Sequence, residues 1–203
     1  LPMNTVSRCS VDMRVKYYKD NLNQGRMDRE EILELFKNED SKQNVLTTLT
    51  QTDDPKIIQE IIKLFDDERI EIRGEVFSTL FLNQNNILKE LIIGLNHESK
   101  NVRGYVLLVL ANRNEKGSIQ EIIKLTKDSS GLVRTCAYGS LGHLESKEAA
   151  SELHKGIFDS NIEAVKSAAY ALSRIKEKIV EKEIERLHEF NDPDFDKILK
   201  FFN

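Results

Sequence analysis

A pattern of about 31 residues repeats along most of this 203-residue chain. Five segments start 31, 30, 31 and 31 positions apart, at Ser41, Ile72, Val102, Val133 and Ala164. Every segment has a small or branched apolar residue four places after its start and a leucine eight places after it. These are Val45, Val76, Val106, Ala137 and Ala168, and Leu49, Leu80, Leu110, Leu141 and Leu172. Five copies in register indicate a repeat protein.

A second helical pattern precedes each copy from the second onward, and its copies align at Ile61, Leu91, Ile122 and Leu153. Within each of these stretches, apolar residues recur at intervals of three and four, as one face of a helix requires. Asp54 followed by Pro55 predicts a helix start, since proline is favoured at the first helical position. The repeating unit is therefore helix–turn–helix. No stretch alternates with period two, so we expect no strands.

One hairpin of this kind cannot bury both of its apolar faces, so neighbouring hairpins must stack into a continuous core. We predict an all-α fold, an α-α superhelix (α-solenoid) of about five helical hairpins with capping helices. The whole of residues 1–203 is expected to form this single solenoid. Residues 1–28 are assigned to the N-terminal cap, 29–175 to the repeats and 176–203 to the C-terminal cap.

Both predicted caps have amphipathic helical patterns. At the N-terminal end, residues 11–24 are expected to form a helix that Gly25 closes. At the other end, a short helix is expected to begin near Pro193. Its apolar side chains are expected to close the last core layer: Phe195, Ile198, Leu199 and Phe202.

These repeats resemble the HEAT-repeat family, and more closely its short bacterial and archaeal branch, the phycobilisome-lyase-like HEAT repeats. That branch reads Val-Arg, two variable residues, Ala, two more, then Ala-Leu-Gly, after a turn aspartate. The segment LVRTCAYGSLG at 132–142 resembles this pattern almost throughout. The resemblance covers about residues 29–190. It implies the fold and says little about function, because this fold hosts scaffolds, receptors and a few enzymes.

The resemblance also implies a structural ladder between adjacent repeats. In the family, an arginine near the start of the second helix usually pairs with a turn aspartate, and His97 stands where one copy lacks that aspartate. The alternative is that the arginines form a phosphate-binding stripe. We favour the ladder because aspartates are at hand and arginine can donate two hydrogen bonds to one carboxylate. Its predicted members are Asp67, Arg73, Arg103, Asp128, Arg134 and Asp159.

Composition narrows the class of protein. Thirty basic and 34 acidic residues give a net charge of −4, which weakens the case for nucleic-acid binding. Cys9 and Cys136 lie too far apart to suggest a disulfide framework or a zinc site. No run approaches the roughly 18 apolar residues that cross a membrane, and the N-terminus has no signal pattern. We expect a cytoplasmic protein without membrane contact.

The densest cluster of reactive side chains is Cys136, Ser140 and His143. A nucleophile needs a base within hydrogen-bond reach. His143 follows Cys136 by seven residues, or roughly 10 Å of helical rise, which is too far for direct contact. We therefore predict that the protein is not an enzyme.

No metal or other cofactor is expected. HEAT-repeat hydroxylases that act on a modified lysine bind two irons through His-Glu dipeptides on their second helices. The matching places here hold no histidine. His154 takes the place of isoleucines in other copies, so it is expected at the edge of the core.

In HEAT solenoids the second helices line the concave side. The residues two, three, six and ten places after each segment start would then face it. Their mixture of tyrosine, leucine, amide and basic side chains suits another protein or peptide, since tyrosine and arginine are frequent at binding hot spots. The predicted binding residues are Glu75, Tyr105, Leu108, Asn112, His143, Lys166, Tyr170 and Arg174.

We predict a non-enzymatic scaffold or adaptor that holds a polypeptide on this face. Two alternatives remain open. The first is nucleic-acid binding, similar to the HEAT-like DNA alkylation-repair glycosylases, with a basic cluster of Lys166, Arg174, Lys176 and Lys178. The second is a chromophore-lyase-like accessory role, which only the family resemblance implies.

Overall fold

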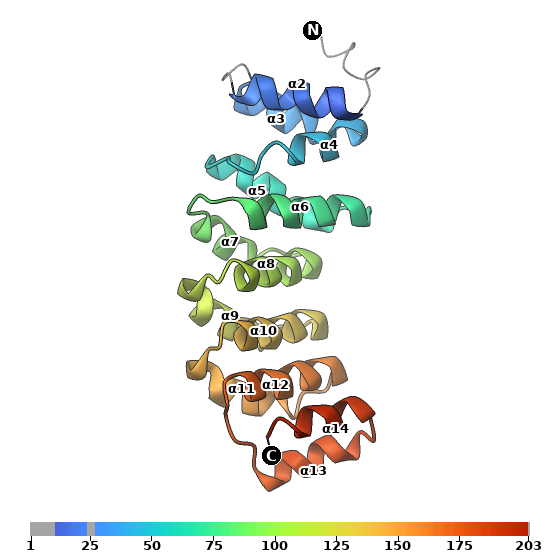
Figure 1. The fold of residues 1–203 in the computed structure, drawn as a ribbon, viewed down its shortest axis with the longest axis vertical. Helices are drawn as coiled ribbons and strands as arrows, with labels where there is room; N and C mark the ends of the chain where they lie inside the picture. The colour runs from blue at the N-terminus through green and yellow to red at the C-terminus, as the bar shows by residue number, and fades with distance from the viewer. Residues whose placement is uncertain (1–10, 24–26, 203) are drawn as a thin grey trace. The chain divides into compact units, whose positions relative to one another are not determined.

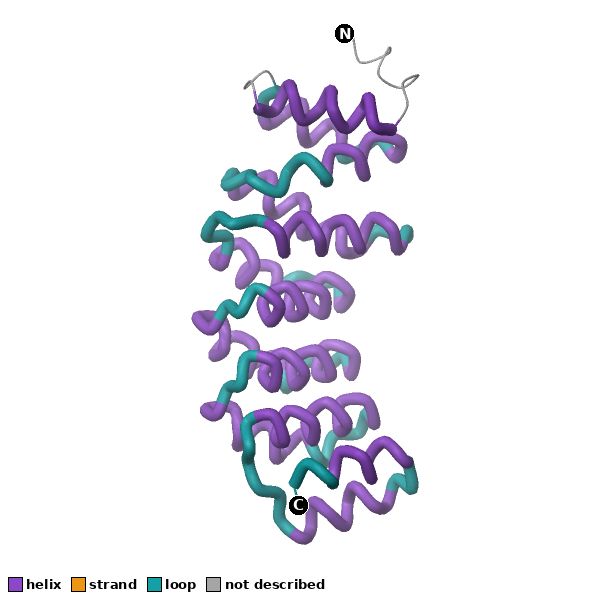
Figure 2. The backbone as a smooth tube through the Cα atoms, viewed as in Figure 1, coloured by secondary structure: helices purple, strands orange, loops and turns teal. Residues whose placement is uncertain are grey.

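The computed structural model describes residues 11–23 and 27–202, and this part of the chain is helical with no strand (Figure 2). The all-α prediction is confirmed. Cys9 and Gly25, the predicted end of the N-terminal helix, lie outside the described residues. No helix in the described ranges is both long enough and apolar enough to cross a bilayer.

The helices follow one another as antiparallel hairpins in the predicted register (Figure 1). The N-terminal helix is α2 (Val11–Asn23). The first helices of the hairpins are α3 (Arg29–Leu35), α5 (Pro55–Lys63), α7 (Leu88–Gly94), α9 (Ile119–Leu125), α11 (Ala150–Gly156) and α13 (Glu181–Glu189). The second helices are α4 (Glu39–Leu46), α6 (Ile70–Leu82), α8 (Lys100–Asn112), α10 (Gly131–His143), α12 (Ile162–Arg174) and α14 (Pro193–Leu199).

The chain divides into two compact units, one that ends at Glu90 and one that begins at Leu91. Residues 176–203, expected as a cap, contain the hairpin α13–α14 in the register of the repeats. Pro193 begins its helix 31 positions after Ile162 begins α12. The single array over residues 1–203 stays a prediction.

The repeating apolar positions form the core of each unit. All five leucines eight places into a copy, from Leu49 to Leu172, are at most 2% exposed. The five small or branched residues four places in, from Val45 to Ala168, are fully buried. Asp54 caps α5 as predicted, because its side chain accepts hydrogen bonds from the backbone N–H groups of Lys56 and Ile57.

Three second helices in the later unit, α8, α10 and α12, end in the same way. Asn114, Glu145 and Lys176 have positive φ angles of 55°, 52° and 58°. The next backbone N–H in each case donates to the carbonyl five residues earlier, as in the bond from Ser146 N to Leu141 O at 3.0 Å. This is the Schellman arrangement, which satisfies carbonyls left unpaired at a helix end.

Two glycines allow close packing in the later unit, Gly142 between adjacent hairpins and Gly156 between the two helices of one hairpin. A Cβ at Gly142 of α10 would lie 2.7 Å from the Cβ and 2.8 Å from the Cα of Ala171 in α12. A Cβ at Gly156 would lie 2.6 Å from the Cβ of Ala168. By contrast, a Cβ at Gly139 meets no described atom within 4 Å outside its own helical turn. Glycine is therefore required by packing at the first two positions only.

We expect the two glycines of α10 to respond in opposite directions to alanine. Gly142→Ala overpacks the contact with Ala171 and should lower the free energy of unfolding by about 1–3 kcal/mol. Gly139→Ala meets no obstacle and should raise it by about 0.5–1 kcal/mol, since alanine is the better helix former. Urea unfolding of both variants measures this difference. Equal effects of the two changes would contradict the packing described here.

Candidate functional site

The candidate binding surface in the later unit is the exposed side of α8, α10 and α12, which lie side by side (Figure 1). We call it the second-helix face. Each helix contributes the residues three, six and ten places after its segment start. They are Tyr105, Leu108 and Asn112 on α8, Cys136, Gly139 and His143 on α10, and Ser167, Tyr170 and Arg174 on α12.

Exposed apolar groups lie on both sides of a gap in this face. Leu108 is 37% exposed and Tyr170 is 47% exposed. Gly139 occupies the matching position on the helix between them, and the space above it is open. The face therefore offers two apolar contacts with a notch between them.

The other predicted binding residues on this face differ in their exposure and in their polar contacts. Asn112 and His143 are exposed, and the Asn112 amide donates to the backbone oxygen of Leu108 at 2.8 Å. Tyr105 is half-buried. Arg174 is exposed and lies 3.0 Å from a carboxylate oxygen of Glu145.

Glu75, the remaining predicted binding residue, lies on α6 in the earlier unit and is half-buried. Burial raises the pKa of its carboxyl group. It belongs to a different unit from the second-helix face.

Lys166 is held by carboxylates of its own chain. Its Nζ lies 2.8 Å from Asp192, 3.5 Å from Asp194 and 3.6 Å from Glu163. The hydrogen bond from Lys166 to Asp192 is the main cause of the raised pKa of this lysine. The ammonium group, which the sequence assigned to partner binding, thus fastens α12 to the start of α14.

The end of the chain also contacts the second-helix face. The rings of Tyr170 and Phe201 meet edge to face, with centroids 6.3 Å apart. Phe201 is 65% exposed, so the two rings form an aromatic pair that remains open to solvent on one side.

The cluster Cys136, Ser140 and His143 has a structural explanation. The Ser140 hydroxyl is buried and donates to the backbone oxygen of Leu107 on the preceding second helix at 2.9 Å. Thr79 makes the equivalent bond to Leu46 at 3.0 Å in the earlier unit. These hydroxyl groups of Ser140 and Thr79 therefore tie adjacent second helices together. Burial raises the pKa of the Cys136 thiol, which disfavours the reactive thiolate.

The predicted ladder residues lie between consecutive hairpins. Arg103 donates through Nε and Nη2 to both carboxylate oxygens of Asp128, at 2.8 Å each. Arg134 makes the same pair of bonds to Asp159, at 2.7 Å each. The Nη1 group of Arg134 also donates to the backbone oxygen of Asp128 at 2.9 Å. One guanidinium thus joins two successive turns.

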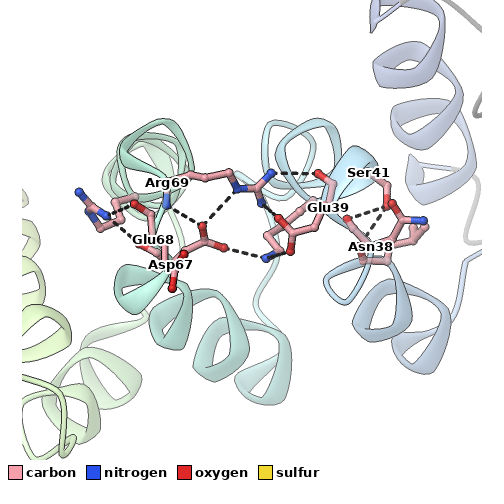
Figure 3. Close-up of polar contacts among 9 residues, drawn as sticks. Asn38, Glu39, Ser41, Asp67, Glu68 and Arg69 are labelled. Atoms are coloured by element: carbon pink, nitrogen blue, oxygen red, sulfur yellow. Dashed lines mark hydrogen bonds and ion pairs between the residues drawn. The ribbon is translucent and has the colours of Figure 1, made fainter.

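The earlier unit contains a lysine version of this junction. Lys42 Nζ lies 2.7 Å from Asp67, and both side chains are nearly buried. Figure 3 shows Asp67 beside Arg69, whose backbone N–H donates to the carboxylate at 3.0 Å. Arg73 donates to the backbone oxygens of Asp67 and Glu68, at 2.7 and 3.0 Å. Arg73 therefore makes the turn contacts of the ladder arginines.

His97 replaces the turn aspartate in one repeat and keeps part of its role. Its Nδ1 accepts a hydrogen bond from the backbone N–H of Ser99 at 3.0 Å. Asp128 and Asp159 accept the equivalent bond from Ser130 and Asn161, at 2.8 Å each. The imidazole therefore supplies the acceptor that the turn requires.

Comparison with known proteins identifies the central part of the chain. Residues 88–173 match the family model for HEAT repeats. This segment is built of HEAT repeats. No curated protein matches the chain.

Solved structures support the same fold. One chain from a crystal structure of computationally designed armadillo repeat proteins for modular peptide recognition is 18% identical, with a TM-score of 0.57, and the match covers 93% of this chain and all of that one. A designed armadillo repeat protein in complex with the peptide (KR)4 is also 18% identical, with a TM-score of 0.51, covering 87% of this chain and all of that one.

The histidine predicted at the edge of the core bonds the following hairpin. His154 is 28% exposed in its side chain, and its Nδ1 lies 2.7 Å from Glu183. Among residues 11–23 and 27–202, no group of three or more His, Cys, Asp or Glu side chains could hold a metal ion. His154 and Glu183 thus form one more link between hairpins.

Removal of one ladder carboxylate should destabilise the HEAT repeats. Asp159→Asn leaves the Arg134 guanidinium, which is 16% exposed, without its ionic partner. We expect the free energy of unfolding to fall by about 3 kcal/mol. Glu145→Gln, which breaks the exposed pair with Arg174, should cost less than about 1 kcal/mol. Similar losses in urea unfolding of the two variants would contradict a special role for the ladder.

The ladder should also make stability depend on pH. Partial burial acts to raise the pKa of Asp67, yet hydrogen bonds from Lys42 and Arg69 outweigh it and lower the pKa to about 2. Because this folded-state pKa is depressed, the stabilisation is complete above the unfolded pKa near 4 and is lost as pH falls toward 2. The stability difference between wild type and Asp67→Asn should therefore shrink over this range. A difference independent of pH in urea unfolding would refute this.

Proposed function

We propose that the second-helix face of α8, α10 and α12 binds an extended polypeptide segment, so that the protein acts as a non-catalytic scaffold or adaptor. The observation that carries the proposal is the pair of exposed apolar side chains, Leu108 and Tyr170, on either side of the open position at Gly139. A polypeptide could cover both contacts and place a side chain in the notch.

The spacing of the helices suits an extended chain. Packed helices lie roughly 8–10 Å apart, and an extended peptide advances about 3.3 Å per residue. A peptide that crosses the helices would thus move by about three residues from one helix to the next. We expect apolar peptide side chains about six residues apart to contact Leu108 and Tyr170, with a residue between them above Gly139.

Polar groups along one edge of the face support binding of a peptide backbone. Asn112, His143 and Arg174 occupy the same position on successive helices, and all three are exposed. Amide, imidazole and guanidinium groups donate hydrogen bonds that peptide carbonyls accept. The similar armadillo designs, which include designs for modular peptide recognition and a design in complex with the peptide (KR)4, add support to this class of partner.

Nucleic-acid binding has less support in the geometry. Of the predicted basic cluster, Lys166 is surrounded by three carboxylates and Arg174 lies beside Glu145. These neighbours reduce the positive charge that phosphate contacts require. We therefore favour a polypeptide.

Selection from a random peptide display library tests the proposal. Peptides enriched on wild type should bind the Leu108→Ala, Tyr170→Ala variant at least about tenfold more weakly in fluorescence anisotropy, because exposed apolar anchors dominate such contacts. Gly139→Leu should weaken binding similarly by filling the notch. Both variants should remain folded, since the changed positions are exposed or open.

A matched control changes equally exposed apolar residues elsewhere on the same unit. Ile93 is 50% exposed and Phe158 is 45% exposed. The Ile93→Ala, Phe158→Ala variant should keep wild-type affinity. If no peptide is enriched, or if the control loses as much affinity as the second-helix variant, the proposal fails.

A further inference from the structure

Phe201 extends the second-helix face of the later unit by one helix. A single row runs through equivalent positions that are 31 residues apart: Leu108, Gly139, Tyr170 and Phe201. The turn after α14 keeps a helix-like course, because the backbone N–H of Phe201 donates to Ile198 O at 3.0 Å. The Phe201 ring then meets the Tyr170 ring, with centroids 6.3 Å apart. The row thus crosses α8, α10, α12 and the end of α14.

The middle of this face carries uncharged residues. They occupy the positions three and six places into each copy, and they are Tyr105, Leu108, Cys136, Gly139, Ser167, Tyr170, Ile198 and Phe201. Matching of charge between partners favours contacts with uncharged side chains here, since a charged group would lose water without gaining an ionic partner. The face therefore suits a segment whose contacting side chains are apolar.

The spacing of the row matches the turn of a polyproline II helix. Packed helices lie roughly 8–10 Å apart, and a polyproline II helix has three residues per turn with a rise of about 9 Å over that turn. Every third residue of such a peptide therefore points to the same side and meets the next second helix.

A β-strand does not match this spacing. Its side chains alternate between two sides, so those that point one way recur about every 7 Å, and the third residue after a contacting one points away. A strand that contacts Leu108 and Tyr170 would turn its side chains away from Gly139 and from Phe201. Of the two extended forms, only polyproline II presents a side chain to all four positions of the row.

The aromatic pair and the polar edge also suit this conformation. Tyr170 is 47% exposed and Phe201 is 65% exposed, and their ring planes lie at 79° to each other. Proline-rich segments dock on surfaces lined by aromatic side chains. Because proline has no backbone N–H, such a segment offers mainly carbonyl acceptors. Asn112 and Arg174 at the edge carry N–H donors for them, and Arg174 uses Nη2 for Glu145 out of five such donors.

We propose that the segment bound by the second-helix face is proline-rich and adopts a polyproline II helix, with Phe201 as the fourth contact of the row. This inference rests on the proposed function, since it names the class of polypeptide that the same face binds. Apolar side chains at every third residue meet the row in order, from Leu108 to Phe201. The preformed backbone of the segment reduces the conformational entropy that binding costs.

Three labelled peptides of equal length test the proposal on the full chain. (Leu-Pro-Pro)4 has leucine at every third residue, (Leu-Pro-Pro-Pro)3 has it at every fourth, and (Leu-Thr)6 alternates as a strand does. In fluorescence anisotropy, (Leu-Pro-Pro)4 should bind at least about tenfold more tightly than the other two, because only its leucines recur with the helices. Equal affinity of the three peptides, or tighter binding of (Leu-Thr)6, would overturn the proposal.

A variant of Phe201 tests the fourth contact. Phe201→Ala should weaken binding of (Leu-Pro-Pro)4 at least about fivefold, because an exposed aromatic anchor is lost. Phe158 is a phenylalanine of the same unit that is 45% exposed and lies outside the row, so Phe158→Ala is the matched control and should keep wild-type affinity. No loss in Phe201→Ala, or an equal loss in the control, would overturn the proposal. Sedimentation that reveals a dimer sensitive to Phe201→Ala would also overturn it, because a second copy would then cover the face.

The peptides selected from the display library separate this inference from the proposed function. If those peptides depend on Leu108 and Tyr170 while (Leu-Pro-Pro)4 shows no preference, the face binds polypeptide and the polyproline II inference fails. If neither the selected peptides nor (Leu-Pro-Pro)4 bind, both fail.

Discussion

The junction between consecutive turns is the constraint on which the stacking of these hairpins depends. Apolar burial drives the hairpins together, but apolar contact alone has no fixed direction or register. The arginine ladder supplies both, since a guanidinium such as that of Arg134 must reach the carbonyls of its own turn and the carboxylate of the next. Its planar, forked geometry accepts only a narrow range of positions. Tight packing at Gly142 and the buried hydroxyl of Ser140 then fit the same arrangement.

The same junctions leave the second-helix side available. Because the charged contacts lie in the turns and the leucines lie in the core, the exposed side of α8, α10 and α12 is not needed to hold the hairpins together. Side chains there can vary with little cost to the fold. The binding surface proposed above accordingly uses exposed positions on the regular frame of buried leucines and ladder contacts.

Much of the fold can be predicted from the sequence, because equivalent positions in successive repeats also occupy equivalent places in the packed structure. The periodic leucines could be derived from spacing and the helix start at Asp54 from the residue types there, while the turn position of His97 followed from the family resemblance. The site was harder to predict. Spacing alone does not show that the ring of Tyr170 meets that of Phe201, since ring contacts depend on how α14 packs.

Lys166 shows that the repeat register alone does not predict which cation pairs with a carboxylate of the next hairpin. Valine occupies the ladder position in that copy, and Lys166 stands one place later, yet its flexible stem still reaches Asp192. The pair of Lys42 and Asp67 could have been predicted from the repeat spacing, because these two residues are 25 positions apart, as Arg103 and Asp128 are. For Lys166 the length and direction of the side chain decide the pair, and the sequence pattern does not specify them.

The short sequence separation of these contacts has a consequence for how such a chain can change in length. The ladder bonds span 25 or 26 residues and the buried hydroxyl bonds span 33, so each joins a hairpin only to its neighbour. Insertion or deletion of one whole unit of about 31 residues would reproduce the same set of junctions. A change of another size between Arg103 and Asp128, or between Arg134 and Asp159, would alter the spacing of a cation and its carboxylate. Lengthening by whole repeats therefore preserves every type of junction described above.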